Sequence, residues 1–453
     1  MSNEEQVDVV IMGMGPGGED VGNELASAGL SVTGIDARLL GGECPFWGCV
    51  PSKMMIRAAD LLGEARRVPQ MAGRATVDPD WTPVAERLRD VTKDWDDSEH
   101  VERFVGRGGN FVRGHAKLVE PNCVEVDGRR FRARRGVVIA TGTEPLIPPI
   151  DGLEGLPYWT NREAIETKEV PQSLIVVGGG AIGSELAQVF ARFGSRVTVV
   201  ESADRLLSSN EPEAGKILRE VFEREGITVH TGVGARRVDH DGTFRVTLDG
   251  GETIEADKLL IATGRKANLS NIGLEVLGLD PEEKSLKVDE HLRVAEGVWA
   301  LGDITGKGQF THVAVYQAHI AAADISGRPG GPADYRAIPS VSFTDPEVGQ
   351  VGMTESRARE EGLDVVVGST PVPETARGWM HKVGNDGFIK LVADRGEGVL
   401  VGATSMGPNG GEVLGLLTLA VHARVPLDTL RSMVYAYPTF HRGVEDALRD
   451  VDL

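Results

Sequence analysis

Two cysteines near the start of the chain have the spacing of a redox pair. Cys44 and Cys49 enclose four residues in the segment CPFWGC. Zinc-binding pairs usually enclose two, and no second pair could complete a tetrahedral site, so we expect no metal. A disulfide across so short a segment constrains little chain, so we interpret the pair as redox-active. The alternative is a pair of buried, inert thiols, the state that we expect for the third cysteine, Cys123.

Two glycine motifs have the residue types that bind dinucleotides. Both read G-x-G-x-x-G, with Gly13, Gly15 and Gly18 in the first copy and Gly178, Gly180 and Gly183 in the second. In this motif the first glycine permits a tight turn and the second admits a pyrophosphate. The third lets the following helix pack closely on its strand. The phosphates then lie at the positive end of that helix.

An acidic residue follows each motif at the distance expected of a ribose ligand. Asp36 follows the first motif and Glu201 the second. A carboxylate there accepts the ribose 2′-hydroxyl and repels a 2′-phosphate, so Glu201 predicts a preference for NADH over NADPH. Arg205 lies near enough in the sequence to weaken this preference.

The elements around the two motifs follow one pattern of strand, glycine turn, helix, strand and acid. The expected elements are a strand at 7–12, a helix at 19–28 and a strand at 31–35, then a strand at 174–177, a helix at 184–193 and a strand at 196–200. Two copies of this unit predict two doubly wound parallel-sheet domains. Alternating strands at about 111–135 and 228–257 predict a small β-meander after each unit.

The last third of the chain has a different pattern. Strands are expected near 340–352, 364–373 and 387–407, and helices near 410–423 and 442–450. The Gly- and Pro-rich segment 326–335 marks the boundary before it. The predicted fold class is therefore α/β, with two Rossmann-like domains and a C-terminal α+β domain.

Composition narrows the partners. The 453 residues carry a net charge of −20, which argues against binding to nucleic acid or to an anionic membrane. The polar, acidic start MSNEEQ does not resemble a secretory signal, and no apolar run is long enough to span a bilayer. We therefore expect a cytoplasmic protein that acts on a small molecule.

Together these motifs resemble the flavoprotein disulfide reductases, the family of dihydrolipoamide dehydrogenase, glutathione reductase and mercuric reductase. The resemblance lies in GGECPFWGCVPSK (41–53), GGGAIGSE (178–185), ALGDIT (300–305), THVA (311–314) and FTDPEVGQVGMTE (343–355). It implies an NAD(P)H-dependent enzyme that contains FAD and forms a homodimer. It also implies FAD-binding segments at 1–148 and 271–335, an NAD(H)-binding domain at 149–270 and an interface domain at 336–453.

The resemblance also implies roles for individual residues. Cys49 would form a charge-transfer pair with the flavin, and Cys44 would be the interchange thiol that faces substrate. Lys53 and Glu185 would form an ion pair near the reactive edge of the flavin. Asp303 would hold the ribitol of FAD and Asp36 its adenosine ribose. The same motifs suggest further cofactor-binding residues, namely Thr141, Gly142, Gly264, His312 and Ala314.

One segment departs from the family pattern. The partner subunit normally contributes a His–Glu dyad in the sequence His-Pro-Thr-x-x-Glu, but this chain has Tyr437 in place of the histidine and Arg442 in place of the glutamate. A phenol with a pKa of about 10 is a poor base at neutral pH. Arg442 could instead lower the pKa of Cys44 or attract an anionic substrate. His441, one residue before Arg442, is a substitute base or an ordinary surface histidine.

The leading hypothesis is an FAD-dependent NADH oxidoreductase. Electrons would pass through the flavin to the Cys44–Cys49 disulfide and then to a disulfide, a quinone or another electrophile that needs little help from a proton donor. The alternatives are a quinone or dye reductase with idle cysteines, a dihydrolipoamide dehydrogenase-type enzyme, and a non-catalytic flavoprotein that senses redox state.

Overall fold

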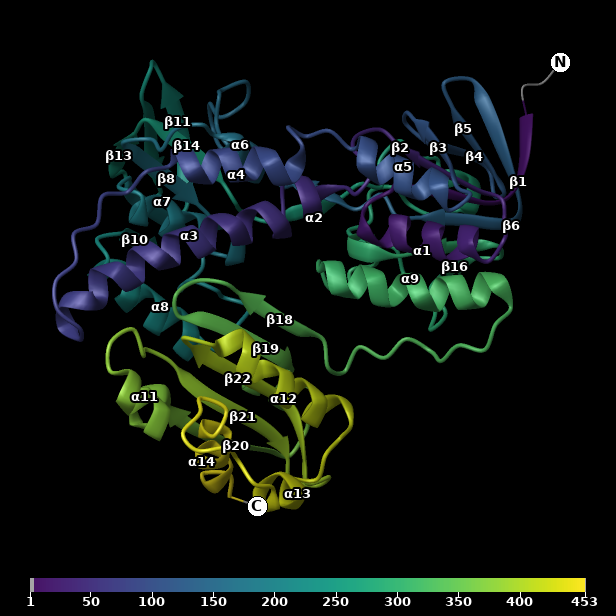
Figure 1. Cartoon of the computed structure of the whole chain (residues 1–453). Coiled ribbons are helices and arrows are strands. Elements are labelled where there is room, and N and C mark those ends of the chain that lie inside the picture. Colours follow the sequence, from purple (N-terminus) through teal and green to yellow (C-terminus); the bar gives the residue numbers. More distant parts are fainter. Residues whose placement is uncertain (1–3, 453) are drawn as a thin grey trace. The chain divides into compact units, whose positions relative to one another are not determined.

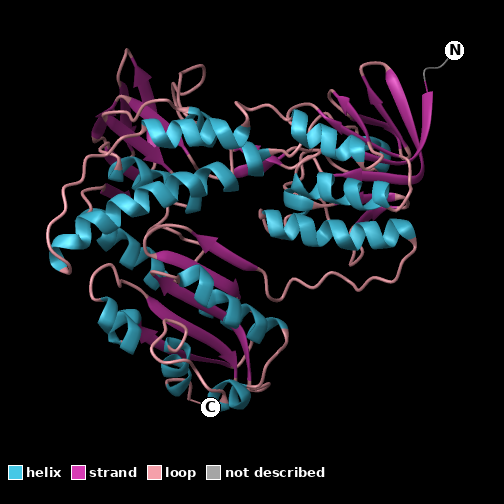
Figure 2. Cartoon of the chain, viewed as in Figure 1, coloured by secondary structure: helices cyan, strands magenta, loops and turns pink. Residues whose placement is uncertain are grey.

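The computed structural model describes residues 4–452, which form two compact units (Figure 1). Unit 1 consists of Met1–Pro51, Arg87–Pro145 and Arg265–Tyr335, and unit 2 of Ser52–Glu86, Leu146–Gly264 and Arg336–Leu453. Each unit mixes helices and strands (Figure 2). The two glycine motifs therefore fall in different units.

Unit 1 is built on an eight-stranded sheet. Its main path runs β16–β17–β6–β1–β2–β3, and the remaining strands β4 and β5 join through β6. The bounds are β1 Glu4–Met12, β2 Val32–Asp36, β3 Asn110–Arg113, β4 Lys117–Glu120, β5 Cys123–Val126, β6 Arg129–Ile139, β16 Arg293–Ala295 and β17 Val298–Ala300. The central pairs β1–β2, β1–β6, β2–β3 and β6–β17 are parallel. The last four residues of β1 are buried, as expected of a parallel strand covered on both faces.

Two helices of unit 1 lie side by side and cover one part of this sheet (Figure 1). They are α1 Pro16–Ser27 and α9 Thr311–Ser326. Val21 and Leu25 of α1 share one apolar core with Ala318 and Ala322 of α9. The remaining elements of unit 1 are α2 Glu43–Phe46, α5 Ser98–Gly106, the strand pair β7 Thr143–Pro145 and β15 Arg265–Ala267, and the 3-10 helices η2 Leu274–Leu277 and η3 Gly302–Thr305.

The nucleotide-binding part of unit 2 contains a four-stranded parallel sheet in the order β10–β9–β8–β14. The elements around it are α6 Asn161–Glu166, β8 Ser173–Val177, α7 Ala181–Arg192, β9 Arg196–Glu201, α8 Pro212–Arg224, β10 Thr228–Thr231 and β14 Lys258–Ile261. Helix α3 Cys49–Arg67 begins at the end of unit 1 and continues in unit 2, where η1 Val68–Gln70 follows it; α4 Thr82–Thr92 spans the other boundary.

Each predicted β-meander wrongly included one strand that belongs to a parallel sheet. In unit 1, β3 pairs in parallel with β2, and in unit 2, β10 pairs in parallel with β9. Both strands thus extend the nucleotide-binding sheets. The antiparallel part of unit 2 is the sheet β11 Ala235–His240, β12 Phe244–Leu248 and β13 Thr253–Ala256. Strand propensity is the same in both settings, so only the tertiary pairing separates β3 and β10 from the meanders.

The C-terminal part of unit 2 is a five-stranded antiparallel sheet in the order β18–β19–β22–β21–β20. The strands are β18 Pro339–Ser342, β19 Glu347–Gly352, β20 Val365–Pro371, β21 Phe388–Asp394 and β22 Val399–Gly407. The helices are α10 Glu355–Glu360, α11 Ala376–His381, α12 Gly410–His422, α13 Leu427–Ser432 and α14 Gly443–Arg449, with the 3-10 turn η4 Val372–Glu374. Residues of α12, α13 and α14 share one core with the sheet.

The predicted fold class is confirmed, with two sheets whose central strands are parallel and a C-terminal α+β part. The four predicted domain segments stay a prediction. The short helices α10, α11 and α13 were not expected, because six residues are too few to establish a clear helical period.

Candidate active site

The first glycine motif forms a turn between β1 and α1 in which each glycine meets a different constraint. Gly13 has a φ of +98°, and a Cβ there would lie 2.3 Å from the Ala140 carbonyl oxygen. A Cβ on Gly18 would lie 2.0 Å from the Gly13 carbonyl oxygen. A Cβ on Gly15 would meet no described atom within 4 Å. The first and third glycines thus close the turn, and the second leaves open space at the start of α1.

The second motif repeats this geometry in unit 2. Gly178 has a φ of +114°, with the Ala262 carbonyl oxygen 2.3 Å from an added Cβ. An added Cβ on Gly183 would lie 2.0 Å from the Gly178 carbonyl oxygen, and one on Gly180 would meet no described atom within 4 Å. Among the described residues, no side chain caps the start of α1 or of α7. Both helix N-termini therefore present backbone N–H groups that fit a pyrophosphate.

The two predicted ribose-binding acids hold their turns in the same way. The Met14 N–H donates to Asp36 Oδ2 at 2.7 Å, and the Gly179 N–H donates to Glu201 Oε2 at 2.6 Å. The other oxygen of each acid accepts the N–H two residues further on. Burial raises the pKa of Asp36 despite these bonds. Each carboxylate is therefore fixed at the carboxyl end of its strand, where a ribose hydroxyl can reach its remaining lone pairs.

The cysteine pair lies directly beside the first glycine turn. Cys44 is in α2, and Cys49 is the first residue of α3. A Cβ added to Gly42 would lie 2.7 Å from the Gly15 Cα, so this loop approaches the turn through its backbone. The loop is anchored by Phe46, which is buried and whose carbonyl accepts the Trp95 indole N–H at 3.2 Å.

Cys44 and Cys49 carry thiols in this structure, and the hydroxyl of Thr311 interacts with both sulfurs. Cys49 Sγ lies 3.4 Å from Thr311 Oγ1 at the first residue of α9. A hydrogen bond with Cys49 and burial raise the pKa of Cys44, while a hydrogen bond with Thr311 opposes the rise. Cys49 is exposed and Cys44 is partly buried. Proximity of the two sulfurs in this loop is what a reversible disulfide requires.

The N-terminal turns of α9 and α1 meet next to these sulfurs. A Cβ on Gly17 would lie 3.2 Å from Ala314 Cβ, so a small residue is needed on both helices. His312, also in this turn, stacks on Phe310 with ring centroids 5.2 Å apart. The predicted residues Ala314 and His312 thus shape the start of α9, and Ala314 does so by packing on α1.

Asp303 lies in a polar chain at the carboxyl end of β17. The Thr143 hydroxyl donates to Asp303 Oδ2 at 2.7 Å, and Arg265 Nε donates to the same hydroxyl at 2.7 Å. Burial raises the pKa of Asp303, which these partners oppose. Thr141 is held by a hydrogen bond of 2.8 Å to the Asn268 carbonyl. The predicted glycines Gly142 and Gly264 both have positive φ and open space at the Cβ position.

In unit 2, Lys53 and Glu185 form the predicted ion pair. Lys53 Nζ lies 2.8 Å from Glu185 Oε2, and the Phe343 N–H donates to Glu185 Oε1 at 2.8 Å. The Lys53 ammonium also lies 4.8 Å from the centre of the Phe343 ring. The buried Glu185 carboxylate and the Phe343 ring thus fix the position of the ammonium group, and the Phe343 N–H fixes Glu185 in turn.

Tyr437 and Arg442 contact each other. The Arg442 guanidinium lies 5.5 Å from the centre of the Tyr437 ring, a cation–π geometry. Arg442 also pairs with Glu445 at 3.3 Å and with Asp446 at 3.7 Å. Tyr437 is 66% exposed. His441 lies apart from this pair, with its Nε2 3.4 Å from Thr439 Oγ1. The charge of Arg442 is thus balanced within its own helix.

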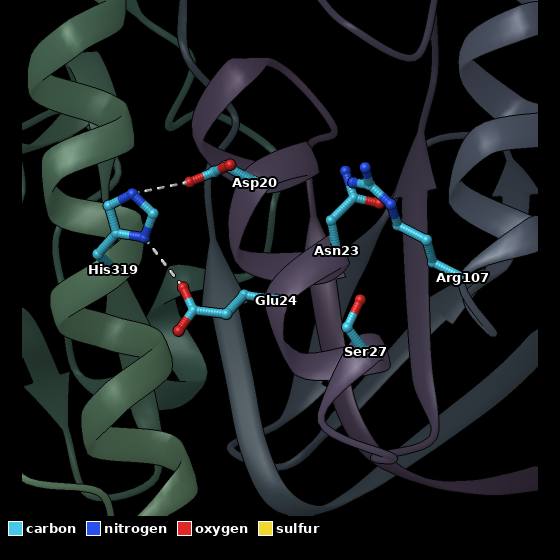
Figure 3. Close-up of a pocket in the computed structure, with 6 residues that line it drawn as sticks. All are labelled: Asp20, Asn23, Glu24, Ser27, Arg107 and His319. Carbon is cyan, nitrogen blue, oxygen red and sulfur yellow. Dashed lines mark hydrogen bonds and ion pairs between the residues drawn. The ribbon is translucent and has the colours of Figure 1, made fainter.

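A separate cavity of about 350 Å³ lies along α1 in unit 1, with His319 of α9 on one side and Arg107, which follows α5, on the other (Figure 3). His319 of α9 reaches two acids of α1, with Nδ1 3.0 Å from Glu24 Oε2 and Nε2 3.6 Å from Asp20 Oδ2. The cavity also contains Arg107, so both signs of charge line it. None of the predicted site residues lies there. The contact ties α1 to α9, the two helices whose N-termini meet beside the cysteines.

Two family comparisons match the chain. Residues 7–318 match the family described as pyridine nucleotide-disulphide oxidoreductase, and residues 338–448 match the dimerisation domain of that family. The chain belongs to this family of NAD(P)H-dependent flavin disulfide oxidoreductases. It is therefore an enzyme of that class with FAD and a nicotinamide nucleotide as cofactors, and the second match supports the predicted homodimer.

Curated relatives and solved structures of similar proteins belong to the same class of enzyme. A dihydrolipoyl dehydrogenase of Chlorobaculum tepidum is 34% identical, covering 98% of this chain and 97% of the relative. A mercuric reductase of Bacillus cereus is 31% identical, covering 98% of this chain and 71% of the relative. The Cu(II) complex of the HOCl-induced flavoprotein disulfide reductase RclA from Escherichia coli has a TM-score of 0.86 at 25% identity, covering 98% of this chain and 99% of that chain. LpdA from Mycobacterium tuberculosis has a TM-score of 0.85 at 27% identity, covering 98% and 99%.

Two kinds of feature are absent from residues 4–452, namely a membrane-spanning helix and a metal-binding cluster. No helix there is long and apolar enough to cross a bilayer. No group of three or more His, Cys, Asp or Glu side chains in the same range could hold a metal ion.

Several residues of this region were missed from the sequence. They are Gly17, Gly42, Thr143, Arg265, Asn268 and Thr311. Most stand next to a predicted residue, and Thr311 even begins the quoted motif THVA. Their contacts are to elements distant in sequence, which local spacing does not reveal.

Replacing Thr311 by Val should weaken the thiolate form of Cys49. A hydrogen bond to a charged group contributes about 1.5–3 kcal/mol, so its loss should raise the pKa of the Cys49 thiol in the reduced enzyme by about 1–2 units. The measurement is the long-wavelength charge-transfer absorbance as a function of pH. Thr311→Ser keeps the hydroxyl and serves as the control, and an unchanged titration in Thr311→Val would show that the 3.4 Å contact is without effect.

Proposed function

We propose that this enzyme carries electrons from NADH through FAD and the Cys44–Cys49 pair to an electrophilic acceptor. The observation that carries the proposal is the position of the cysteine loop. It contacts the first glycine turn through Gly42 and the start of α9 through Thr311. A redox-active pair in that position is next to the surface that fits a dinucleotide.

We infer that unit 1 holds FAD. The open space at Gly15 and the uncapped start of α1 fit its pyrophosphate, Asp36 fits the adenosine ribose, and Asp303 fits the ribitol. Thr141, Gly142, His312 and Ala314 would shape the rest of this surface. Bound FAD supplies the acceptance of a hydride and its transfer onward as two electrons. The residues named above would hold FAD in one position.

The nicotinamide nucleotide belongs to the second turn in this proposal. Gly180 and the start of α7 fit its pyrophosphate, and Gly264 leaves space at the end of β14. Glu201 would accept the adenosine ribose hydroxyls. The Lys53 ammonium, fixed by Glu185, would stabilise the negative charge that a hydride brings.

The two cysteines take different roles. We assign Cys49 to the flavin, because the hydroxyl of Thr311 can stabilise its thiolate. We assign Cys44 to the acceptor. The hydride of NADH brings two electrons and one proton, and a second proton from solvent completes the conversion of the disulfide into two thiols. When the disulfide forms again, the acceptor takes both electrons and the two protons pass to the acceptor or to solvent. Because the pKa of Cys44 is raised, this thiol keeps its proton at neutral pH unless a partner removes it.

The Tyr437–Arg442 pair limits the types of acceptor that the enzyme could use. A stacked phenol is a poor base, and the Arg442 charge is balanced by Glu445 and Asp446, which argues against the earlier idea of a free cation for an anionic substrate. An acceptor with a good leaving group, a quinone or a soft metal ion needs the least proton transfer. Relatives named for Hg(II) and for a Cu(II) complex justify testing both ions.

The proposal is tested by replacing each cysteine with serine. Flavin reduction by NADH should persist in Cys44→Ser and Cys49→Ser, whereas turnover of the acceptor found in a screen of disulfides, quinones and metal ions should fall to background. The measurement is NADH consumption with stopped-flow flavin absorbance, and Cys123→Ser is the matched control. Full turnover in both variants would instead identify a quinone or dye reductase with idle cysteines.

Wild type should be reduced faster by NADH than by NADPH. Glu201 would face the extra phosphate, and like charges brought together cost several kcal/mol. Glu201→Gln removes the charge and should narrow the ratio of the two rates by about tenfold or more. Arg205 is held by Asp204 and by the Ser208 carbonyl, so Arg205→Gln should change the ratio much less. A wild type that clearly prefers NADPH would contradict this role of Glu201.

Restoring the dyad should create a dithiol–disulfide catalyst. General-base catalysis typically contributes about 10²–10⁴-fold, so wild type should oxidise dihydrolipoamide very slowly while NADH reduces its flavin fast. Tyr437→His with Arg442→Glu should raise lipoamide turnover, and Tyr437→His alone should do less, because nothing orients the imidazole. Steady-state assays in both directions measure this. A wild type with fast lipoamide turnover would mean that His441 or water carries the proton, which His441→Ala would then distinguish.

A further inference from the structure

Helix α3, which carries Cys49 and Lys53, is bound to α7 by two ion pairs on one face. Lys53 pairs with Glu185 at 2.8 Å, and Asp60 pairs with Arg192 at 2.8 Å. The two pairs are seven residues apart on each helix, which is about two turns and therefore the same face. Their polarity is reversed, with a cation and then an anion on α3. A displacement of α3 by two turns would bring Asp60 against Glu185, so the pairs specify one register.

Arg192 is the buried centre of a charged cluster whose acids are partly exposed. Its side chain is 2% exposed. Nη1 donates to Asp60, Nη2 donates to Asp345 at 2.6 Å, and Nε and Nη2 donate to Glu225 at 3.1 and 2.7 Å. A Cβ added to Gly63 of α3 would lie 2.8 Å from the guanidinium carbon. The Arg192 cluster, defined here as Arg192, Asp60, Glu225 and Asp345, therefore lies directly against α3.

The same face of α7 holds the segment Phe343–Asp345. Glu185 accepts the Phe343 N–H, and Gln188 exchanges two hydrogen bonds with the Asp345 backbone at 2.8 and 2.9 Å. Arg192 then binds the Asp345 side chain. The oxygen of Glu185 that does not contact Lys53 is thus fixed by this segment, and the segment is fixed by Arg192.

Apolar groups fill the space between the two ion pairs. Ile56 and Ala59 of α3 and Val189 of α7 line it, and it leaves no room for a water molecule. Charges in such a place interact more strongly than in water. A change of charge at Asp60 is therefore felt along α3.

Asp60 is the carboxylate of the cluster that can lose its charge. Burial raises the pKa of Asp60 to about 6, even though Arg192 opposes this shift. In contrast, the charges of Arg192 and Arg67 overcome burial and lower the pKa of Asp345. The ionisable groups that face Asp60 or the cluster from each packed element are Arg57, Arg66 and Arg67 of α3, Arg192 of α7, Glu225 after α8, Asp345 and Glu347 around β19, and His381 of α11.

We propose that Asp60 and Arg192 are positioning residues, which hold α3 so that the Lys53 ammonium stays on Glu185, and which release it when Asp60 takes up a proton. The catalytic consequence of this positioning rests on the role proposed above for Lys53 and Glu185. The positioning itself can be measured without turnover.

The test is the acetylation of Lys53 in the FAD-loaded enzyme, followed by mass spectrometry with light and heavy reagent for variant and wild type. Asp60→Asn mimics the protonated state. At about pH 7.5 it should raise the labelling of Lys53 threefold to about tenfold relative to wild type. Below about pH 5.5 the ratio should approach one, because Asp60 of wild type is then protonated too. The titration of His381 affects both proteins equally and cancels in the ratio.

Two controls separate positioning from a general loss of structure. Glu64→Gln removes an exposed carboxylate that pairs with Arg67 on the same helix and should leave the ratio at one. Asp60→Glu keeps the charge and should restore most of the protection. A ratio of one for Asp60→Asn at pH 7.5, or the same excess at both pH values, overturns the proposal. If labelling follows the expectation but Lys53→Met is reduced by NADH as fast as wild type, the positioning stands and the role assigned to Lys53 fails.

Discussion

The close approach of a helix to the end of a parallel strand is the constraint on which both nucleotide sites depend. In each glycine turn an added Cβ on the third glycine would lie 2.0 Å from the carbonyl oxygen of the first. No other residue allows the helix to start so near the strand, and only from there do its free N–H groups and the acid of the next strand face the same space.

In unit 1 the redox loop depends on the turn directly. Gly42 brings the loop against Gly15 by backbone contact, and α9 arrives at the same place because Gly17 and Ala314 are small. The Thr311 hydroxyl is then in reach of both sulfurs. Close backbone packing therefore positions the sulfurs, and the Thr311 hydroxyl is one of the groups that affect their pKa values.

In unit 2 the charged side chains carry more of the organisation. Lys53 and Asp60 on α3 meet Glu185 and Arg192 on α7, and the segment beginning at Phe343 is bound to the same face of α7. In each pair one side chain is buried and the other is partly exposed. Desolvation of the buried charge offsets much of the attraction, so such pairs contribute more to register than to stability. They suit a helix whose position matters more than its strength of attachment. In the C-terminal part of this unit, Tyr437 and Arg442 contact each other at the positions where the family pattern has its His–Glu dyad.

The sequence by itself determined the two turns, the acids that follow them and the cysteine pair, because each depends on residues only a few positions apart whose types have a local physical meaning. It also indicated three strand segments of the C-terminal sheet, near 340–352, 364–373 and 387–407, and the structure divides the first and third of these into two strands each. The tertiary structure alone decided that β3 and β10 extend the parallel sheets, that the Thr311 hydroxyl contacts the sulfurs, and that Asp60 pairs with Arg192. These contacts join residues from separate elements or combine several partners at once. Their energies depend on burial and on shared charges, which no local pattern of residue types encodes.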